Sequence, residues 1–257
     1  MNAQIIPIDE LKKVVPSAFA KSPHSSRSSK YSFIPTERLI EDMEKMQWYP
    51  TYARQDFSKV NAGFQKHMIR FRKNFQEGLE RYPELLLINS HNGRSRCIVY
   101  GGFIEAVCSN GLISVSLQSQ SSFRILHMHY VFSEIENLVA NIIEDVNEQS
   151  KNINKFIELE LDESKKMWVA KQVVSTLYPE QSVDINRLLQ PRRKEQERND
   201  LWTVWNVIQE NVIKGGVKFL HENKETTSRE VKNIRKEVLS NLALWGILTA
   251  SYKALNK

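Results

Sequence analysis

The chain has 257 residues, 41% of them hydrophobic and 26% charged, which suits one large domain or one domain with a helical extension. Its formal net charge of +6 is moderately basic and excludes a histone-like protein. No apolar run approaches the about 18 residues of a membrane-spanning helix, and the first residues lack the long apolar core of a signal peptide. We therefore expect a cytoplasmic protein without a membrane partner.

Charge is distributed in blocks along the chain. Residues 54–96 contain nine basic residues against four acidic ones, and the segment from residue 214 to the end has the same numbers. Residues 134–165 contain nine acidic residues against three basic ones. Such alternation fits a protein with one side that faces a polyanion, a homo-oligomer that associates head to tail, or ordinary solvated faces.

The first 30 residues are expected to form a flexible arm. A short amphipathic piece at 9–15 is followed by SPHSSRSSK at 22–30. The second segment is rich in serine and basic residues, so it cannot bury a core of its own.

After the arm, the pattern predicts a helix and then a strand. Thr36 is a residue type that caps helix N-termini. Apolar side chains recur at helical spacing up to Met46, so we predict an amphipathic helix over residues 37–46. The sequence WYP ends this helix, and a strand follows over residues 51–57.

Residues 64–75 are typical of a strand with two unlike faces. Because successive side chains of a strand alternate, His67, Ile69 and Phe71 share one face, which is mainly apolar. The other face is mainly basic and carries Lys66, Met68, Arg70 and Arg72.

The segment 84–129 alternates apolar runs with turn dipeptides. Three of these dipeptides are two-residue hairpin signals: Asn92-Gly93, Gly101-Gly102 and Asn110-Gly111. Five strands are therefore predicted, over about 85–90, 95–100, 103–108, 112–117 and 123–128. Their short connections predict an antiparallel meander.

After residue 133 the apolar spacing becomes helical. Helices are predicted over residues 135–161, 163–177, 185–189, 191–216 and 230–256. The polar residues 217–228 are predicted as a mobile loop. The order helix, sheet, helices predicts an α+β fold. Its parts are a flexible arm at 1–30, an α+β sheet core at 31–132, and a helical part at 133–257 that packs on the sheet.

Five pieces of the chain resemble a known family: KYSFIPTERLI, KHMIRFRK, LLLINSHNG, GGFIEAVCSNGL and NDLWTVWNVIQENVIKGG. They make nearly the whole chain similar to domain-of-unknown-function family 932, in particular its plasmid and prophage proteins. The resemblance implies a mobile-element setting and no particular reaction. A weaker resemblance, over residues 30–73, is to phage single-strand annealing proteins of the Erf type. It implies an oligomer with a basic groove for single-stranded DNA.

Five scattered side chains are candidate metal ligands: His67, His91, Cys108, His127 and His129. A zinc or iron site needs three or four of them to converge. Histidines that make core hydrogen bonds and thiols that stay reduced explain the same residues. The sequence has no tight ligand pair, no nucleotide-binding glycine motif and no catalytic signature, so we predict no cofactor, metal or catalytic residue.

Binding of single-stranded nucleic acid, with DNA as the expected class, is the best supported activity. The candidate phosphate-binding residues are Lys66, Arg70, Arg72, Arg94 and Arg96. The candidate base-stacking residues are Tyr49, Tyr52 and Phe64, with Phe57 close to them in sequence. A basic groove with aromatic platforms is what sequence-tolerant binding of single strands requires.

Two functions follow from these observations. The first is an oligomeric phage or plasmid protein that binds single-stranded DNA and anneals or recombines it. The alternative is a non-enzymatic counter-defence protein that binds and inhibits a host defence complex.

Overall fold

The computed structural model describes residues 4–28, 31, 33–60, 62–73, 81–105, 111–112, 122–124, 132–221 and 224–257. The chain divides into two compact units, Met1–Asn147 and Glu148–Lys257. The long helix α3 (Phe132–Glu158) begins in the first unit and ends in the second. A sheet with packed helices, followed by a helical region, confirms the predicted α+β class.

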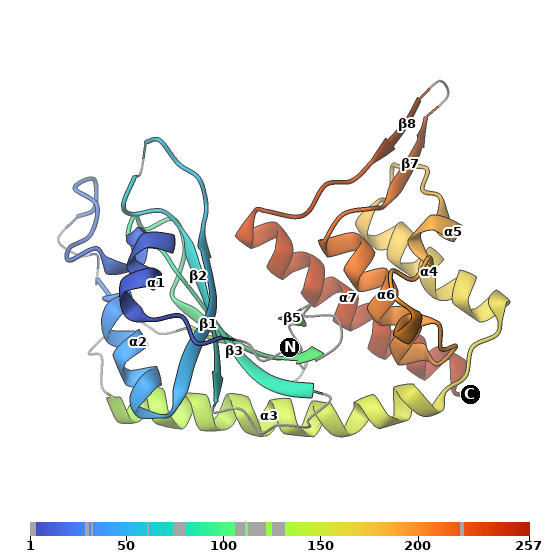
Figure 1. Ribbon diagram of the computed structural model, residues 1–257, viewed down its shortest axis with the longest axis horizontal. Coiled ribbons are helices and arrows are strands. Elements are labelled where there is room, and N and C mark those ends of the chain that lie inside the picture. The colour runs from blue at the N-terminus through green and yellow to red at the C-terminus, as the bar shows by residue number, and fades with distance from the viewer. Residues whose placement is uncertain are drawn as a thin grey trace. The chain divides into compact units, whose positions relative to one another are not determined.

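The first unit is built on an antiparallel meander (Figure 1). Its four neighbouring strands are β1 (Trp48–Gln55), β2 (His67–Lys73), β3 (Arg81–Asn89) and β4 (Ile98–Glu105). Two short strands, β5 (Gly111–Leu112) and β6 (Ser122–Arg124), both pair with β4. The other residues predicted as strands at 106–108, 113–117 and 125–128 lie outside the described residues.

The predicted hairpin at Gly101-Gly102 is wrong, because both glycines lie inside β4, which pairs with β3 along its length. Tertiary packing explains the first glycine. A Cβ on Gly101 would lie 2.6 Å from the side chain of Ile142 and 2.5 Å from that of Val146, both on α3. Gly101 therefore lets α3 approach the sheet and does not form a turn.

Helices cover one face of this sheet (Figure 1). They are α1 (Ile8–Val14), the short 3-10 helix η1 (Pro16–Phe19) and α2 (Thr36–Lys45). Leu11, Val15 and Ala18 are fully buried, and the amide of Ile6 donates to the carbonyl of Pro50. Much of the expected arm is thus helical and packed, because its few apolar residues find partners on α2 and β1.

The second unit contains α4 (Glu163–Leu177), α5 (Ile185–Leu188), η2 (Lys194–Gln196), α6 (Leu201–Ile213) and α7 (Ile234–Leu255). Asp162, Asp184, Asp200 and Asn233 cap α4, α5, α6 and α7, each accepting from a backbone amide three residues on. The predicted helix over 191–216 is shorter than expected, because Asp200 fixes its start at Leu201.

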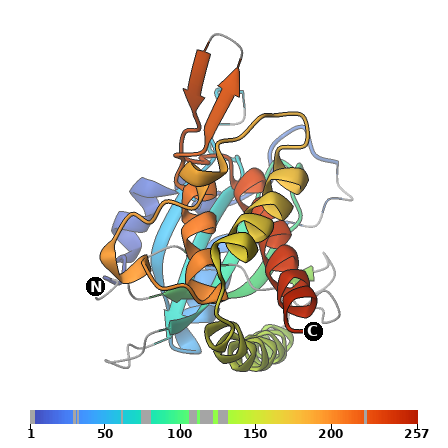
Figure 2. The same ribbon diagram turned by 90° about the vertical axis from the view of Figure 1, so that its right-hand side faces the viewer.

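The predicted loop over 217–228 is a hairpin instead. Strands β7 (Lys218–His221) and β8 (Lys224–Thr227) pair with each other and extend away from the helices of their unit (Figure 2). The second strand, KETT, has no apolar residue, so no alternating pattern marked this hairpin in the sequence. Its base is held by a bridge between Val183 and Phe219.

Aromatic side chains form the core of the second unit. Trp202 stacks on Trp205 with ring centroids 5.3 Å apart, and the edge of Trp245 meets Trp205 at 6.3 Å. The indole of Trp205 is fully buried and donates to the carbonyl of Leu244 at 3.1 Å. Among the helices that the structure describes, none is both long and apolar enough to cross a membrane.

Candidate nucleic-acid interface

A buried polar cluster lies where β2 begins and β3 ends. His67 is the first residue of β2, His91 follows β3, and both imidazoles are fully buried with ring centroids 5.2 Å apart. The hydroxyl oxygen of Thr36 lies between them, 2.8 Å from His67 Nε2 and 3.0 Å from His91 Nε2. Thr36 therefore does not cap α2 as predicted, since its hydroxyl binds the histidines and the helix has no side-chain cap.

The hydrogen bonds assign the proton positions on both rings. His67 Nδ1 lies 3.1 Å from the carbonyl of Gln65, so it carries the proton and its Nε2 accepts from Thr36. Having donated its only proton, the Thr36 oxygen accepts from the amide of Asn89 at 3.0 Å and from His91 Nε2. His91 is therefore protonated at Nε2.

Burial keeps both imidazoles neutral. It lowers the pKa of His67 to about 3, with the neighbouring His91 as a second cause, and it lowers the pKa of His91 to about 4. Within the described ranges no group of three metal-ligating side chains is found. Three of the candidate ligands, Cys108, His127 and His129, lie outside those ranges.

Three loops meet over this cluster, and we call residues 22–28, 56–60, 62–66 and 91–97 the loop surface. The amide of His24 donates to the carbonyl of His91 at 2.9 Å, and the amide of His91 donates to that of Phe64 at 3.1 Å. The rings of His24 and Phe64 meet edge to face at 5.2 Å. The buried histidine thus connects the ends of two strands to the serine-rich segment.

Positive charge is concentrated on the loop surface, which contains five basic residues and one acidic residue. The basic residues are Arg27, Lys59, Lys66, Arg94 and Arg96. In the part of the chain that the structure describes, none of the five forms an ion pair. Phe57 is 87% exposed and Val60 is 83% exposed on the same surface. The loop surface therefore offers solvated cations beside an exposed ring.

The side chain of Arg27 lies against the turn at Asn92-Gly93. Gly93 has a φ of +70°, which favours glycine, and a Cβ there would lie 2.7 Å from Cδ of Arg27. The amide of Arg94 donates to the side chain of Asn92 at 3.0 Å and closes the turn. A turn at Asn92-Gly93 between two antiparallel strands is therefore confirmed, but the connection covers residues 90–97 and is not the predicted two-residue loop.

Arg70 and Arg72 have a different environment from the one predicted for a phosphate-binding face. The carboxylate of Glu84 lies 2.8 Å from Arg70 Nη1 and 3.2 Å from Arg72 Nε. Arg70 is only 7% exposed, and its guanidinium lies 5.7 Å from the centre of the Tyr52 ring. The register of the sheet explains the pair, since β2 and β3 place these residues on the face opposite His67.

The other candidate residues are divided between the loop surface and the sheet. Lys66, Arg94 and Arg96 belong to the loop surface, as does Phe64, which is half-buried. Tyr49 is half-buried on β1 opposite Arg72, outside the loop surface. Sequence reasoning missed Arg27, which is far from β2 in sequence, and Lys59, which is isolated in a loop. It also missed Glu84, whose position opposite Arg72 depends on the strand register.

The fold and the site define an α+β protein whose first unit carries a basic loop surface over a buried histidine pair. The chain belongs to the family described as a domain of unknown function (DUF932), whose model matches residues 23–245.

Two curated proteins of Escherichia coli (strain K12) are similar to it. The UPF0380 protein YfjQ is 35% identical over 245 residues, which is 92% of this chain and 88% of YfjQ. The UPF0380 protein YafZ is 32% identical over 242 residues, again 92% of this chain and 88% of YafZ. No solved structure matches the chain.

Proposed function

We propose that this protein binds single-stranded nucleic acid, DNA in the first place, through the loop surface. The observation that carries the proposal is the concentration of five basic residues against one acidic residue, none of the five in an ion pair among the described residues. Cations without carboxylate partners bind phosphates strongly, because binding releases counterions from the nucleic acid and breaks no ion pair in the protein.

Exposed rings would supply the second part of such a site. Phe57 lies in the loop between β1 and β2, close in sequence to Lys59. Stacking of one base on an aromatic side chain contributes about 1–3 kcal/mol and is tolerant of sequence. Bases of a duplex are stacked on each other, so this contact favours single strands.

Arg70 and Arg72 have a structural role in this proposal. Both guanidinium groups donate to the carboxylate of Glu84, which offsets much of their charge. They hold β2 and β3 together on the face opposite His67, and the phosphate contacts come from Lys66, Arg94 and Arg96.

Fluorescence anisotropy with a labelled oligo-dT and with a duplex of equal length tests the proposal. The full chain should bind the single strand more tightly, and affinity should fall as salt rises. The double variant Arg94→Ala/Arg96→Ala should bind at least about tenfold more weakly at low salt, and its salt slope should be smaller by about 1.4, or about 0.7 per phosphate contact. Phe57→Ala should weaken binding and leave the slope unchanged.

The matched control is Lys151→Ala/Lys171→Ala, which removes two exposed positive charges from helices α3 and α4 in the second unit. It should leave both affinity and slope near those of the unchanged protein. An equal loss in both double variants would show that net charge, and not the loop surface, carries the binding. Absence of single-strand binding at low salt would refute the proposed function.

A further inference from the structure

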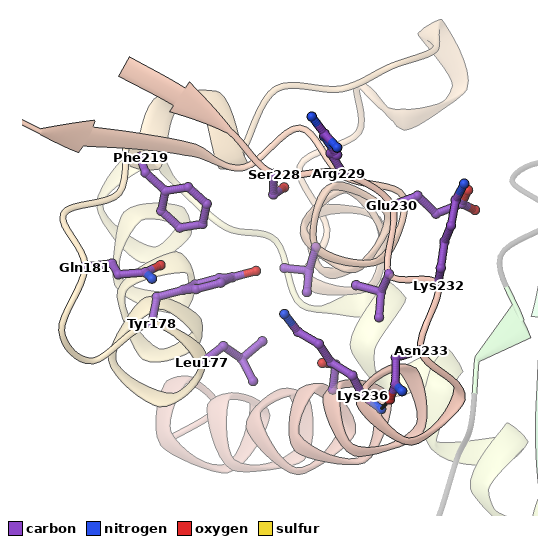
Figure 3. A pocket seen from close by; sticks show the side chains of 13 residues that line it. Leu177, Tyr178, Gln181, Phe219, Ser228, Arg229, Glu230, Lys232, Asn233 and Lys236 are labelled. Atoms are coloured by element: carbon purple, nitrogen blue, oxygen red, sulfur yellow. Dashed lines mark hydrogen bonds between the residues drawn. The ribbon is translucent and has the colours of Figure 1, made fainter. Parts of the chain in front are cut away.

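The second unit contains a cavity of about 550 Å³ at the start of α7 (Figure 3). Its walls come from the C-terminal end of α4, from α6, from β7 and from the segment 228–233 that leads into α7. Pockets of about 300–1,000 Å³ hold small organic ligands. The volume therefore suits a compound of that size.

One side of the cavity is aromatic and aliphatic. The rings of Tyr178 and Phe219 meet edge to face with centroids 5.4 Å apart. Leu177, Val212 and Val231 are further apolar residues of the lining. Burial raises the pKa of the Tyr178 phenol, which keeps the hydroxyl protonated as a donor. A flat ring of a ligand would be covered by these groups.

Basic residues also belong to the lining of the cavity. Arg229, Lys232 and Lys236 line it, against the single carboxylate of Glu230. That carboxylate lies 3.2 Å from the ammonium of Lys214, which does not line the cavity. Figure 3 shows the Lys236 side chain and the Tyr178 hydroxyl pointing into the cavity, whereas the side chains of Arg229 and Lys232 point outward at its rim. A negatively charged ligand is favoured there by simple charge complementarity.

Backbone contacts fix the wall that carries these cations. The amide of Gly216 donates to the carbonyl of Ser228 at 3.0 Å, and the amide of Val231 donates to that of Ile213 at 2.9 Å. Gly215 has a φ of +85°, and a Cβ on it would lie 2.7 Å from the Ser228 carbonyl oxygen. Only glycine there lets the segment 228–230 pass so closely, so the cavity exists before any ligand binds.

We propose that this cavity binds a nucleoside monophosphate, with the base beside Tyr178 and Phe219 and the phosphate on the ammonium of Lys236. A flat ring matches the aromatic pair, and an anionic group matches the inward-pointing ammonium of Lys236. The site lies wholly in the second unit and shares no residue with the loop surface, so it goes beyond the function proposed above.

Isothermal titration calorimetry of the full chain with dAMP, deoxyadenosine and inorganic phosphate tests this proposal. Binding of dAMP should exceed that of either part alone by at least about tenfold, because each part fills only one side of the cavity. Lys236→Gln should weaken dAMP binding about tenfold and leave deoxyadenosine binding unchanged, since the lost contact is to the phosphate. Tyr178→Leu should weaken binding of dAMP and of deoxyadenosine alike.

The control is Lys253→Gln, an equal change of charge at an exposed position on the same helix that does not line the cavity. Absence of dAMP binding at millimolar concentration, or an equal loss in Lys236→Gln and Lys253→Gln, would overturn the proposal. Failure of the loop-surface proposal is a separate result, because Arg94→Ala/Arg96→Ala should bind dAMP normally.

Discussion

Thr36 holds two imidazoles with one hydroxyl group. It donates to His67 and accepts from His91 and Asn89, so every hydrogen-bonding site on this oxygen is used. Satisfied polar groups in a core fix one arrangement of the elements that carry them, whereas a single missing partner leaves several groups unpaired. The cluster therefore fixes the entry of α2 against the ends of β2 and β3, where the loop surface begins.

Replacing Thr36 with Val should destabilise the first unit strongly. The substitution keeps the shape of the side chain and leaves three buried groups without their partner, at a cost on the order of 2–4 kcal/mol. Urea unfolding measures this change. Thr36→Ser keeps the hydroxyl and should recover most of the stability, and equal losses in the two variants would show that the methyl group matters more than the hydrogen bonds.

The same cluster predicts loss of stability in mild acid. The pKa values of His67 and His91, about 3 and about 4, lie below the ordinary value of 6.5, so the unfolded chain binds more protons than the folded one. The neutral rings stabilise the fold fully above pH 6.5, and this contribution is lost as pH falls toward 4 and 3. The limiting slope is about 1.4 kcal/mol per pH unit for each ring.

Unfolding midpoints in urea between pH 7.5 and pH 4.5 measure this slope. Carboxylates also titrate near the lower limit, so the comparison is with His67→Gln. The variant should show a flatter pH dependence than the unchanged protein, whatever its absolute stability. Parallel curves would show that the buried rings do not set the acid sensitivity.

Strand β4 shows how packing changes the meaning of a sequence signal at the scale of an element. Gly101-Gly102 has the composition of a hairpin turn, yet it continues a strand that pairs with β3 from Ile88 back to Arg81. The small residue is required by α3, which crosses the sheet where a Cβ would have no room. The helix brings the two branched side chains of Ile142 and Val146, whose χ1 angles are stiff, directly onto this strand.

Gly101→Ala should therefore lower the free energy of unfolding by about 1–3 kcal/mol, because it forces Ile142 and Val146 away from the sheet. Gly246 is the matched control. It lies within α7, and a Cβ there meets nothing within 4 Å. Gly246→Ala should stabilise the protein by about 0.5–1 kcal/mol, since alanine favours the helix. Chemical unfolding measures both changes. A change in the free energy of unfolding with the same sign in both variants would contradict the packing argument.

The whole molecule has two cores of different kinds. The first unit buries mainly aliphatic side chains, with Phe71 and Phe103 among them, between a sheet and helices, and the second buries a cluster of tryptophans among helices. Four of the five tryptophans belong to the second unit, and Trp48 alone belongs to the first. Each unit also carries its own proposed site. Stability and binding in the two units should therefore be separable.

Unfolding in urea should show this separation. With Trp48 replaced by Phe, tryptophan fluorescence reports only the second unit. In that background Gly101→Ala should leave the fluorescence midpoint unchanged and lower the unfolding midpoint of the first unit, which circular dichroism detects. Gly246→Ala should raise the fluorescence midpoint. A fluorescence midpoint that follows Gly101→Ala would show that the two cores unfold as one cooperative unit.

The sequence by itself determined the class of fold and most of the elements. The helix over 163–177 and the turn at Asn92-Gly93 were both predicted, because each depends on spacing or on turn residues close in sequence. Short pieces of sequence also predicted the family, and the family model that matches residues 23–245 confirms it. Lys66, Arg94 and Arg96 were recognised as basic positions for the same local reason.

Only the tertiary structure decided which residues act together. Strand register gives Arg70 and Arg72 a shared carboxylate at Glu84, and α3 gives Gly101 its role inside a strand. Loop contacts bring Arg27 to the turn at Gly93, and the cavity beside Tyr178 joins side chains from four separate segments. The physical reason is the same in each case. Periodicity reports which face of an element is apolar, but the partner of a charge and the space beside a glycine depend on elements far away in sequence.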